Sequence, residues 1–283
     1  MSAVLTVAGY GLREALRRKV FAVVCLLTVA FLGLYWVGNR YTFHHVGQIV
    51  PPAGVDAPTF AGAFLFGMAM FGTLFLGVVL AIFLTLGVVR GDAERGLLQP
   101  LVVRPVGRST VLVARFLGAG AVCVPYVLAI YFATMVLTGL EGSWWPDRIV
   151  TPGLELAGAV LVVAALSLLG SVFLSSIANG IAIFMLFGAG LVAGLLGNIG
   201  HALNSGGLVH AAKIAAWAVP FEALYQDALR SITENTSGLT GFLLRLGPFG
   251  GAEQGGVALR LWAVAYLAIV GAIALAGFAR RDL

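Results

Sequence analysis

Residues 156–199 read LAGAVLVVAALSLLGSVFLSSIANGIAIFMLFGAGLVAGLLGNI and contain no charged side chain. A helix needs about 20 mostly apolar residues to cross the hydrocarbon core of a bilayer. The stretch is too long for one crossing, and small and polar residues interrupt it near its middle. We therefore predict two membrane spans, at 154–175 and 180–199, divided at Ser175, Ser176, Asn179 and Gly180.

The composition of the whole chain also indicates a lipid environment. Of its 283 residues, 60% are hydrophobic and 10% are charged, whereas a soluble domain carries about 25% charged residues. The 17 basic and 12 acidic side chains are too few to cover the surface of a soluble protein, which excludes a soluble enzyme. A nucleic-acid-binding protein is excluded as well, because membrane orientation accounts for the net charge of +5.

Charge-free windows elsewhere in the chain predict four further spans. All six are expected to be helices, since open sheets do not cross lipid and the segments lack the two-residue alternation of barrel strands. We predict one all-α transmembrane domain over residues 1–283, with an interfacial helix at 3–19 and a long outer segment at 200–256. The predicted spans are 20–38, 62–89, 110–139, 154–175, 180–199 and 257–279.

The positions of arginine and lysine predict the orientation of these spans. Placing both termini in the cytoplasm puts 11 basic residues on that side and six on the other. Loops rich in Lys and Arg remain in the cytoplasm. We expect a multi-pass protein of a bacterial plasma membrane with both ends in the cytoplasm.

Two outer segments have recognisable local patterns. The loop 39–60 carries Pro51, Pro52 and Pro58, which predict irregular structure. Residues 221–230 read FEALYQDALR, and helical spacing places Glu222, Gln226 and Arg230 on one face. We expect this short helix to lie at the outer interface or to dip into it.

Catalytic and metal sites are not indicated by the sequence. No predicted span carries a charge near its centre, where ion-coupled carriers and membrane enzymes place ionisable groups, and Glu155 near a span end is typical of an interfacial side chain. All four histidines fall outside the predicted spans, and the adjacent His44 and His45 have no evident third ligand. Asp92 and Glu94 are flanked by arginines and are interpreted as a charge network. We predict no catalytic residue, metal or cofactor in this chain.

A nucleotide-binding motif is also absent from the sequence. A Walker A loop requires Gly-Lys-Ser/Thr, and the lysines Lys19 and Lys213 follow arginine and alanine instead. If ATP drives this protein, another chain must bind it.

The loop after the second predicted span is the most charged stretch of the chain. Residues 91–108 read GDAERGLLQPLVVRPVGR, and helical spacing places Leu97, Leu98 and Leu101 on one side of a short element that ends at Pro105. A short helix with an apolar ridge and charged flanks at the inner membrane face is suited to docking into a cleft of another protein. The alternative is a positive loop without a partner.

This loop resembles that of the ABC-type-2 exporter permeases, in which an acidic residue and a glycine lead into leucines and a P-V-[SG]-R turn. The basic N-terminal helix, the six spans, the outer segment and the ending FARRDL (278–283) extend the resemblance over the chain. Gln99 and Pro100 depart from the family pattern and predict a shorter or kinked element. The matching residues are Glu94, Gly96, Leu97, Leu98, Pro105, Val106, Gly107 and Arg108.

The resemblance implies the permease subunit of an ATP-driven exporter, with six spans forming half of a translocation path. It implies pairing in membrane lipid with a second copy or a homologous permease, and docking of two ABC ATPase subunits that bind ATP and Mg²⁺. The implied ATPase-coupling residues are Asp92, Glu94, Arg95, Gly96, Leu97, Leu98, Leu101, Arg104, Pro105 and Arg108. The candidate outer-gate residues are Pro220, Phe221, Glu222, Gln226 and Arg230, and the candidate path-lining residues are Phe64, Phe71 and Phe75.

Some interpretations stay open at this point. The pair Gly190 and Gly194 forms a GxxxG that could pack between subunits or within one. The phenylalanines of the second span are either path-lining or core residues. The alternative functions are a membrane scaffold or assembly factor without transport and an ion-coupled carrier, of which the charge-free spans disfavour the carrier.

Overall fold

The computed structural model describes residues 19–49, 55–86, 108–233 and 256–280, and the regular elements in these ranges are helices. Six of the helices are long and apolar enough to cross a membrane. The prediction of an all-α fold with six spans is therefore confirmed. The six are α2 (Lys19–His44), α3 (Ala57–Thr85), α6 (Arg108–Gly142), α7 (Thr151–Phe173), α8 (Ser176–Ala202) and α12 (Gly256–Ala279).

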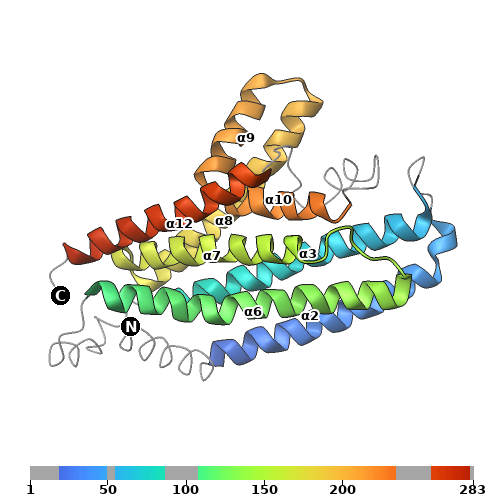
Figure 1. Cartoon of the computed structure of the whole chain (residues 1–283), viewed down its shortest axis with the longest axis horizontal. Coiled ribbons are helices and arrows are strands. Elements are labelled where there is room, and N and C mark those ends of the chain that lie inside the picture. Colours follow the sequence, from blue (N-terminus) through green and yellow to red (C-terminus); the bar gives the residue numbers. More distant parts are fainter. Residues whose placement is uncertain (1–18, 50–54, 87–107, 234–255, 281–283) are drawn as a thin grey trace.

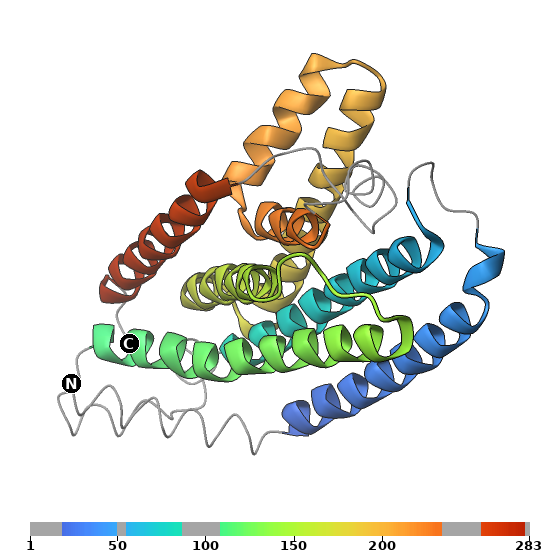
Figure 2. The same ribbon diagram turned by 45° about the vertical axis from the view of Figure 1, so that its right-hand side comes forward.

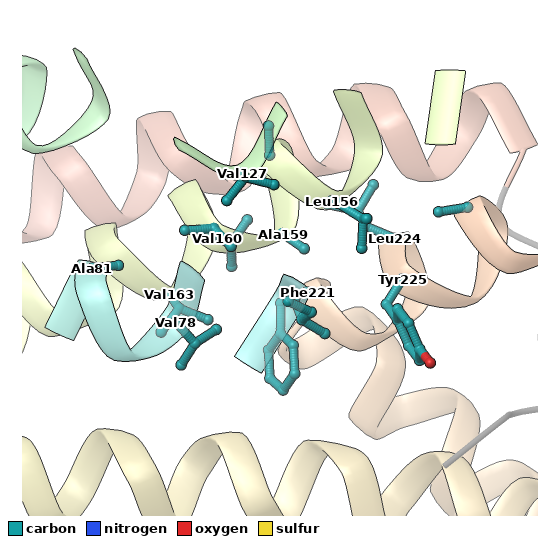
Figure 3. Close-up of a cluster of buried hydrophobic side chains, with 14 of the residues drawn as sticks. Val78, Ala81, Val127, Leu156, Ala159, Val160, Val163, Phe221, Leu224 and Tyr225 are labelled. Atoms are coloured by element: carbon teal, nitrogen blue, oxygen red, sulfur yellow. The ribbon is translucent and has the colours of Figure 1, made fainter. Parts of the chain in front are cut away.

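Helix α7 forms the centre of the bundle (Figure 1). It packs against α3, α6, α8 and α12, and 67% of the residues in its most apolar window are buried. Its inward residues Leu156 and Val160 belong to the same buried cluster as Val78 of α3 and Val127 of α6 (Figure 3). Burial on several sides explains why α7 is apolar around its whole circumference.

Helix α2 lies at the edge of the bundle, chiefly against α3 and α6 (Figures 1 and 2). It exposes large apolar side chains, including Leu34, which a lipid environment accommodates. Two hydroxyl pairs attach it to α6. The oxygens of Thr28 and Tyr126 are 2.5 Å apart, and so are those of Tyr35 and Thr138.

The chain after α8 forms a projecting hairpin and then returns to the bundle. Helix α9 (Gly206–Ala218) runs back along the last part of α8, and this hairpin projects from the bundle (Figures 1 and 2). The short helix α10 (Phe221–Ser231) follows at once and packs mainly against α7, with further contacts to α3, α8 and α12. The first part of the predicted outer segment is thus largely helical.

Several predicted boundaries were wrong. Helix α2 continues to His44 instead of ending at residue 38, so that one of the four histidines lies inside a candidate span. Helix α3 begins at Ala57, because Asp56 accepts a hydrogen bond from the Thr59 N–H (3.1 Å) and Pro58 occupies the first turn, where its missing N–H is not needed. Pro58 therefore starts a helix and does not disorder the loop. Helix α3 also ends before the predicted residue 89.

Other predictions fall outside the described residues. The interfacial helix lies almost wholly in residues 1–18, and Pro51 and Pro52 lie in residues 50–54. The coupling element lies in residues 87–107. These expectations stay predictions.

The five tryptophans mark one end of the bundle. Trp36 lies toward the end of α2, Trp144 and Trp145 lie between α6 and α7, Trp217 lies near the end of α9, and Trp262 lies near the start of α12. Tryptophan is enriched where a spanning helix passes through the membrane–water interface. This end therefore lies at one face of the membrane.

Candidate functional site

The most polar helix among those described is buried in the bundle. In α10, Glu222 is 3% exposed and Gln226 is 1% exposed, while Phe221 and Leu224 pack with α7 and α8 residues in the main core (Figure 3). The sequence predicted that this helix lies at the outer interface or dips into it. The structure adds that neighbouring helices cover both faces of α10, which the sequence did not indicate.

Two glycines of α8 allow the close approach of α10. A Cβ atom added to Gly190 would lie 2.6 Å from the ring of Phe221, and one added to Gly194 would lie 2.9 Å from Nε2 of Gln226. Any larger residue would push α10 away. The GxxxG pair therefore packs within the chain, which resolves the open alternative for these two residues.

The N-terminal half of α10 reaches deep into the bundle. Gly190 lies near the middle of α8, and Phe71 lies near the middle of α3, where its ring centroid is 6.2 Å from that of Tyr225. The nearby Phe187 of α8 contacts Phe221 at 5.1 Å between centroids. Helix α10 thus enters the apolar interior that the spanning helices enclose.

Polar atoms of α10 are enclosed in this interior. The hydroxyl of Tyr225 and Oε1 of Gln226 are buried and have no hydrogen-bond partner among the described residues. Burial raises the pKa of the Tyr225 hydroxyl, and the nearby carboxylate of Glu222 raises it further. The hydroxyl therefore stays protonated at neutral pH. Polar groups at membrane depth are costly, and they mark functional positions more often than structural ones.

An ion network ties α10 to two spanning helices near the tryptophan-bearing end. Arg260 of α12 approaches Oε1 of Glu155 with Nη2 at 2.6 Å and Nε at 2.7 Å, and its Nη2 lies 3.1 Å from Oδ2 of Asp227 in α10. The backbone N–H of Gly256 donates to Oδ1 of Asp227 at 3.3 Å. The network therefore joins α7, α10 and α12.

Glu155 lies near the end of its span, as expected for an interfacial side chain, but it is buried by protein, which the sequence did not indicate. Its side chain is 5% exposed, and its cation is 105 residues away in the chain. A carboxylate can be buried when a cation and hydrogen bonds compensate it. No local sequence pattern could indicate so distant a partner.

The candidate path-lining phenylalanines lie on one face of α3, and the structure brings two of them close to α8 and α10. Phe64 stacks with Phe60 at 6.2 Å between centroids, Phe71 meets Tyr225, and Phe75 meets Phe187 at 6.4 Å. Sequence reasoning missed the aromatic partners Phe187 of α8 and Tyr225 of α10. The spacing of aromatic residues within each helix does not indicate contacts between helices. Whether these rings line a path stays a prediction.

The predicted ATPase-coupling residues cannot be placed in this arrangement. All of them except Arg108 lie in the range 87–107, outside the described residues, and Arg108 begins α6. Pro220 and the other candidate gate residues, by contrast, are grouped at or in α10.

One comparison with known proteins covers nearly the whole chain. A family model described as ABC-2 family transporter protein matches residues 5–283, which include every helix named above. No curated protein matches the chain significantly.

Proposed function

The chain belongs to the ABC-2 transporter family, and from this premise we propose that it is the permease subunit of an ATP-driven exporter. The observation that carries the proposal is the family match over residues 5–283, which spans all six apolar helices. Six spans form half of a translocation path, so two permease subunits would pair. Because the sequence holds no Walker A motif, ATP and Mg²⁺ would be bound by two separate ATPase subunits.

Residues 91–108 are proposed to transmit the motion of the ATPase to the permease. The sequence supports this role. Its leucines suit an apolar cleft of the ATPase, and its charged residues would fix the position of the segment in that cleft. Coupling requires that the two ATPase states favour two permease states differently. The docking contacts are therefore expected to control both ATPase association and export.

Substitution in this segment tests the coupling role. Glu94→Arg places a third positive charge beside Arg90 and Arg95, and we expect weaker association with the ATPase or uncoupled ATP hydrolysis. Leu97→Asp combined with Leu98→Asp removes the apolar ridge and should abolish association. The measurements are co-purification with a candidate ABC ATPase subunit, ATPase turnover and substrate export in liposomes.

Membrane insertion of each variant is the control, because both substitutions lie outside the six spans. If the double leucine variant keeps full association and export, the segment is not the docking element. If only the Glu94 variant keeps them, that carboxylate has no part in coupling.

Helix α10 is proposed as the gate at the outer end of the path. The support is its position among α3, α7 and α8 and the ion network that fastens it to α12. Because apolar packing in the main core also holds α10, this role requires that an open and a closed arrangement of that packing lie close in energy. ATP-driven motion of the spanning helices would then move α10 relative to α8.

Glu222→Gln distinguishes a gate from an ion site. The substitution keeps the shape of the side chain and removes its charge, so we expect a modest change in export rate without any new dependence on added metal or on pH. Export that is restored by added metal would contradict the gate and indicate an ion site.

The proposed orientation has its own test. In a background without Cys25 and Cys123, cysteines at Gly47 and Gly238 should react with an impermeant thiol reagent in intact cells. Cysteines at Gly91 and Gly107 should not. Labelling of the second pair from outside would reverse the orientation and remove the coupling role of residues 91–108.

A further inference from the structure

A cavity of about 490 Å³ lies where α7, α10 and α12 meet, beside the ion network. Ligand pockets are typically about 300–1,000 Å³, so this space can hold a small polar group. The lining includes three arginines from separate parts of the chain. The residues used below are Arg148, Thr151, Asp227, Arg230, Gly256 and Arg260.

The charges around the cavity favour an anion. The lining carboxylate of Asp227 already accepts from Arg260 and from the Gly256 N–H. Arg148 and Arg230 also line the cavity and add two further guanidinium groups. Both also make contacts elsewhere in the chain, and a guanidinium group has five N–H donors, so it can serve two acceptors at once.

Two helices begin at the cavity wall. Thr151 is the first residue of α7, and Gly256 is the first residue of α12. The first N–H groups of a helix have no partner within the helix and carry partial positive charge. At α7 the N-cap residue Val150 supplies no side-chain acceptor. The Gly256 N–H is already bonded to Asp227, residue 152 is a proline, and the Leu154 N–H donates to the Val150 carbonyl. The helix starts therefore contribute chiefly partial positive charge beside the arginines.

The depth of the cavity indicates where its ligand comes from. Trp262 follows Arg260 by two residues in α12, donates its indole N–H to the Trp217 carbonyl at 2.8 Å, and belongs to the tryptophan-bearing end. Tryptophan lies at headgroup level. Basic pockets between spanning helices on the cytoplasmic or matrix side bind anionic headgroups, and the same donor chemistry would act at the outer face, where the proposed orientation puts this cavity.

We propose that this cavity binds a phosphate group, presented by an anionic phospholipid or by soluble phosphate. Arginine matches phosphate oxygens with two parallel N–H donors, and the partial positive charge at the helix starts adds to the attraction. A bound phosphate would bridge α7, α10 and α12 at the same place as the ion network. The site is independent of ATP coupling and of the proposed direction of transport.

The experiment measures binding of two probes to the purified full chain in a neutral detergent. The probes are a short-chain phosphatidic acid and inorganic phosphate, titrated by calorimetry. We expect saturable binding of at least one probe to the wild type. Arg148→Gln combined with Arg230→Gln should weaken it about tenfold or more, since charge-assisted hydrogen bonds contribute about 1.5–3 kcal/mol each. Arg40→Gln, an exposed arginine of α2 outside the cavity, is the matched control and should change little.

A second variant keeps the test informative if the double substitution does not fold. Thr151→Glu places an acidic residue in the first turn of α7, which favours the helix, and its charge should repel the probe from the cavity. Binding of phosphatidic acid alone would identify a lipid headgroup as the ligand, and binding of inorganic phosphate would identify the free anion. The proposal is overturned if neither probe binds the wild type, if Thr151→Glu binds as well as the wild type, or if Arg40→Gln loses binding equally.

Discussion

The most apolar stretches of helices α7 and α2 are nearly equal in hydropathy but occupy opposite environments. In α7, 67% of the residues in the most apolar window are buried by protein, whereas in α2 the share is 6%. Lipid tails are as apolar as leucine, so both environments select the same residue types. Hydropathy therefore identifies a span without showing whether its neighbours are protein or lipid.

The two helices also differ in how they are attached. Helix α7 is held by close apolar packing along its length and by the salt bridge of Glu155. Helix α2 is linked to α6 by hydroxyl pairs at two levels. Matched substitutions in the two helices should therefore lower the free energy of unfolding by different amounts.

The largest difference is expected between Leu156→Ala and Leu34→Ala. Leu156 is fully buried in α7, and its truncation should lower the free energy of unfolding by about 2–5 kcal/mol because it leaves a cavity. Leu34 is 76% exposed in α2, and the same truncation should change stability by less than about 0.5 kcal/mol. Unfolding of both variants in the same detergent measures the contrast, and equal losses would mean that α2 is packed against protein.

The ion network should show the next largest effect. Arg260→Gln leaves the buried carboxylate of Glu155 without its cation, and breaking a buried pair costs about 3–5 kcal/mol. Because Arg260 is 44% exposed, solvent screens part of this, and we expect about 2 kcal/mol. The control Arg40→Gln removes only an exposed contact 5.9 Å above the Trp36 ring and should cost below about 1 kcal/mol.

A double variant tests the ion network of Glu155 and Arg260 further. Glu155→Gln combined with Arg260→Gln removes both charges and should recover part of the stability lost in the single Arg260 variant. A double variant that is less stable than the single one would show that the carboxylate has other essential partners.

Two valine substitutions compare different faces of α8. Gly190→Val alters the face that supports α10, and Gly188→Val alters a face with no close neighbour. The added side chain at Gly190 collides with Phe221, and overpacking of this kind should cost about 1–3 kcal/mol. A Cβ at Gly188 meets nothing within 4 Å, so valine there should be close to neutral. Thermal unfolding of the two variants is the measurement. Equal tolerance would show that α10 is not seated on α8.

The smallest effect is expected at the attachment of α2. Thr28→Val removes the hydroxyl that meets Tyr126 while keeping the side-chain volume. Hydrogen bonds between membrane helices contribute on average about 0.6 kcal/mol, and we expect a loss of that size. A loss of several kcal/mol would mean that the hydroxyl pair, and not the apolar contact, holds α2 in place.

The sequence predicted the spans well because charge is excluded from the hydrocarbon core in any packing arrangement. It missed the end of α2, since Arg40 and His44 interrupt the charge-free window without ending the helix. It also missed the start of α3, because Pro58 is compatible with a first helical turn.

The arrangement around α10 could not be predicted, for a physical reason. Whether Glu222 faces water or protein depends on which helix covers it, and that helix is fixed by the glycines of α8. The partner of Glu155 is likewise set by tertiary packing and lies in a different helix. The candidate gate residues lie together at or in α10, but their burial was not foreseen, and their role as a gate stays a prediction.

The proposed gate requires that α10 is a buried helix and that ATP-driven motion exposes it. The direct measurement is the labelling rate of a cysteine at Ala228, a fully buried residue of α10, by an impermeant thiol reagent in proteoliposomes without Cys25 and Cys123. A cysteine at the exposed Lys213 of α9 provides the reference rate. We predict that Ala228→Cys is protected without nucleotide and reacts faster when the partner ATPase hydrolyses ATP, while Lys213→Cys reacts quickly in both conditions. Rapid labelling of Ala228→Cys without nucleotide would contradict the buried position of α10, and an unchanged slow rate during ATP hydrolysis would contradict its role as a gate.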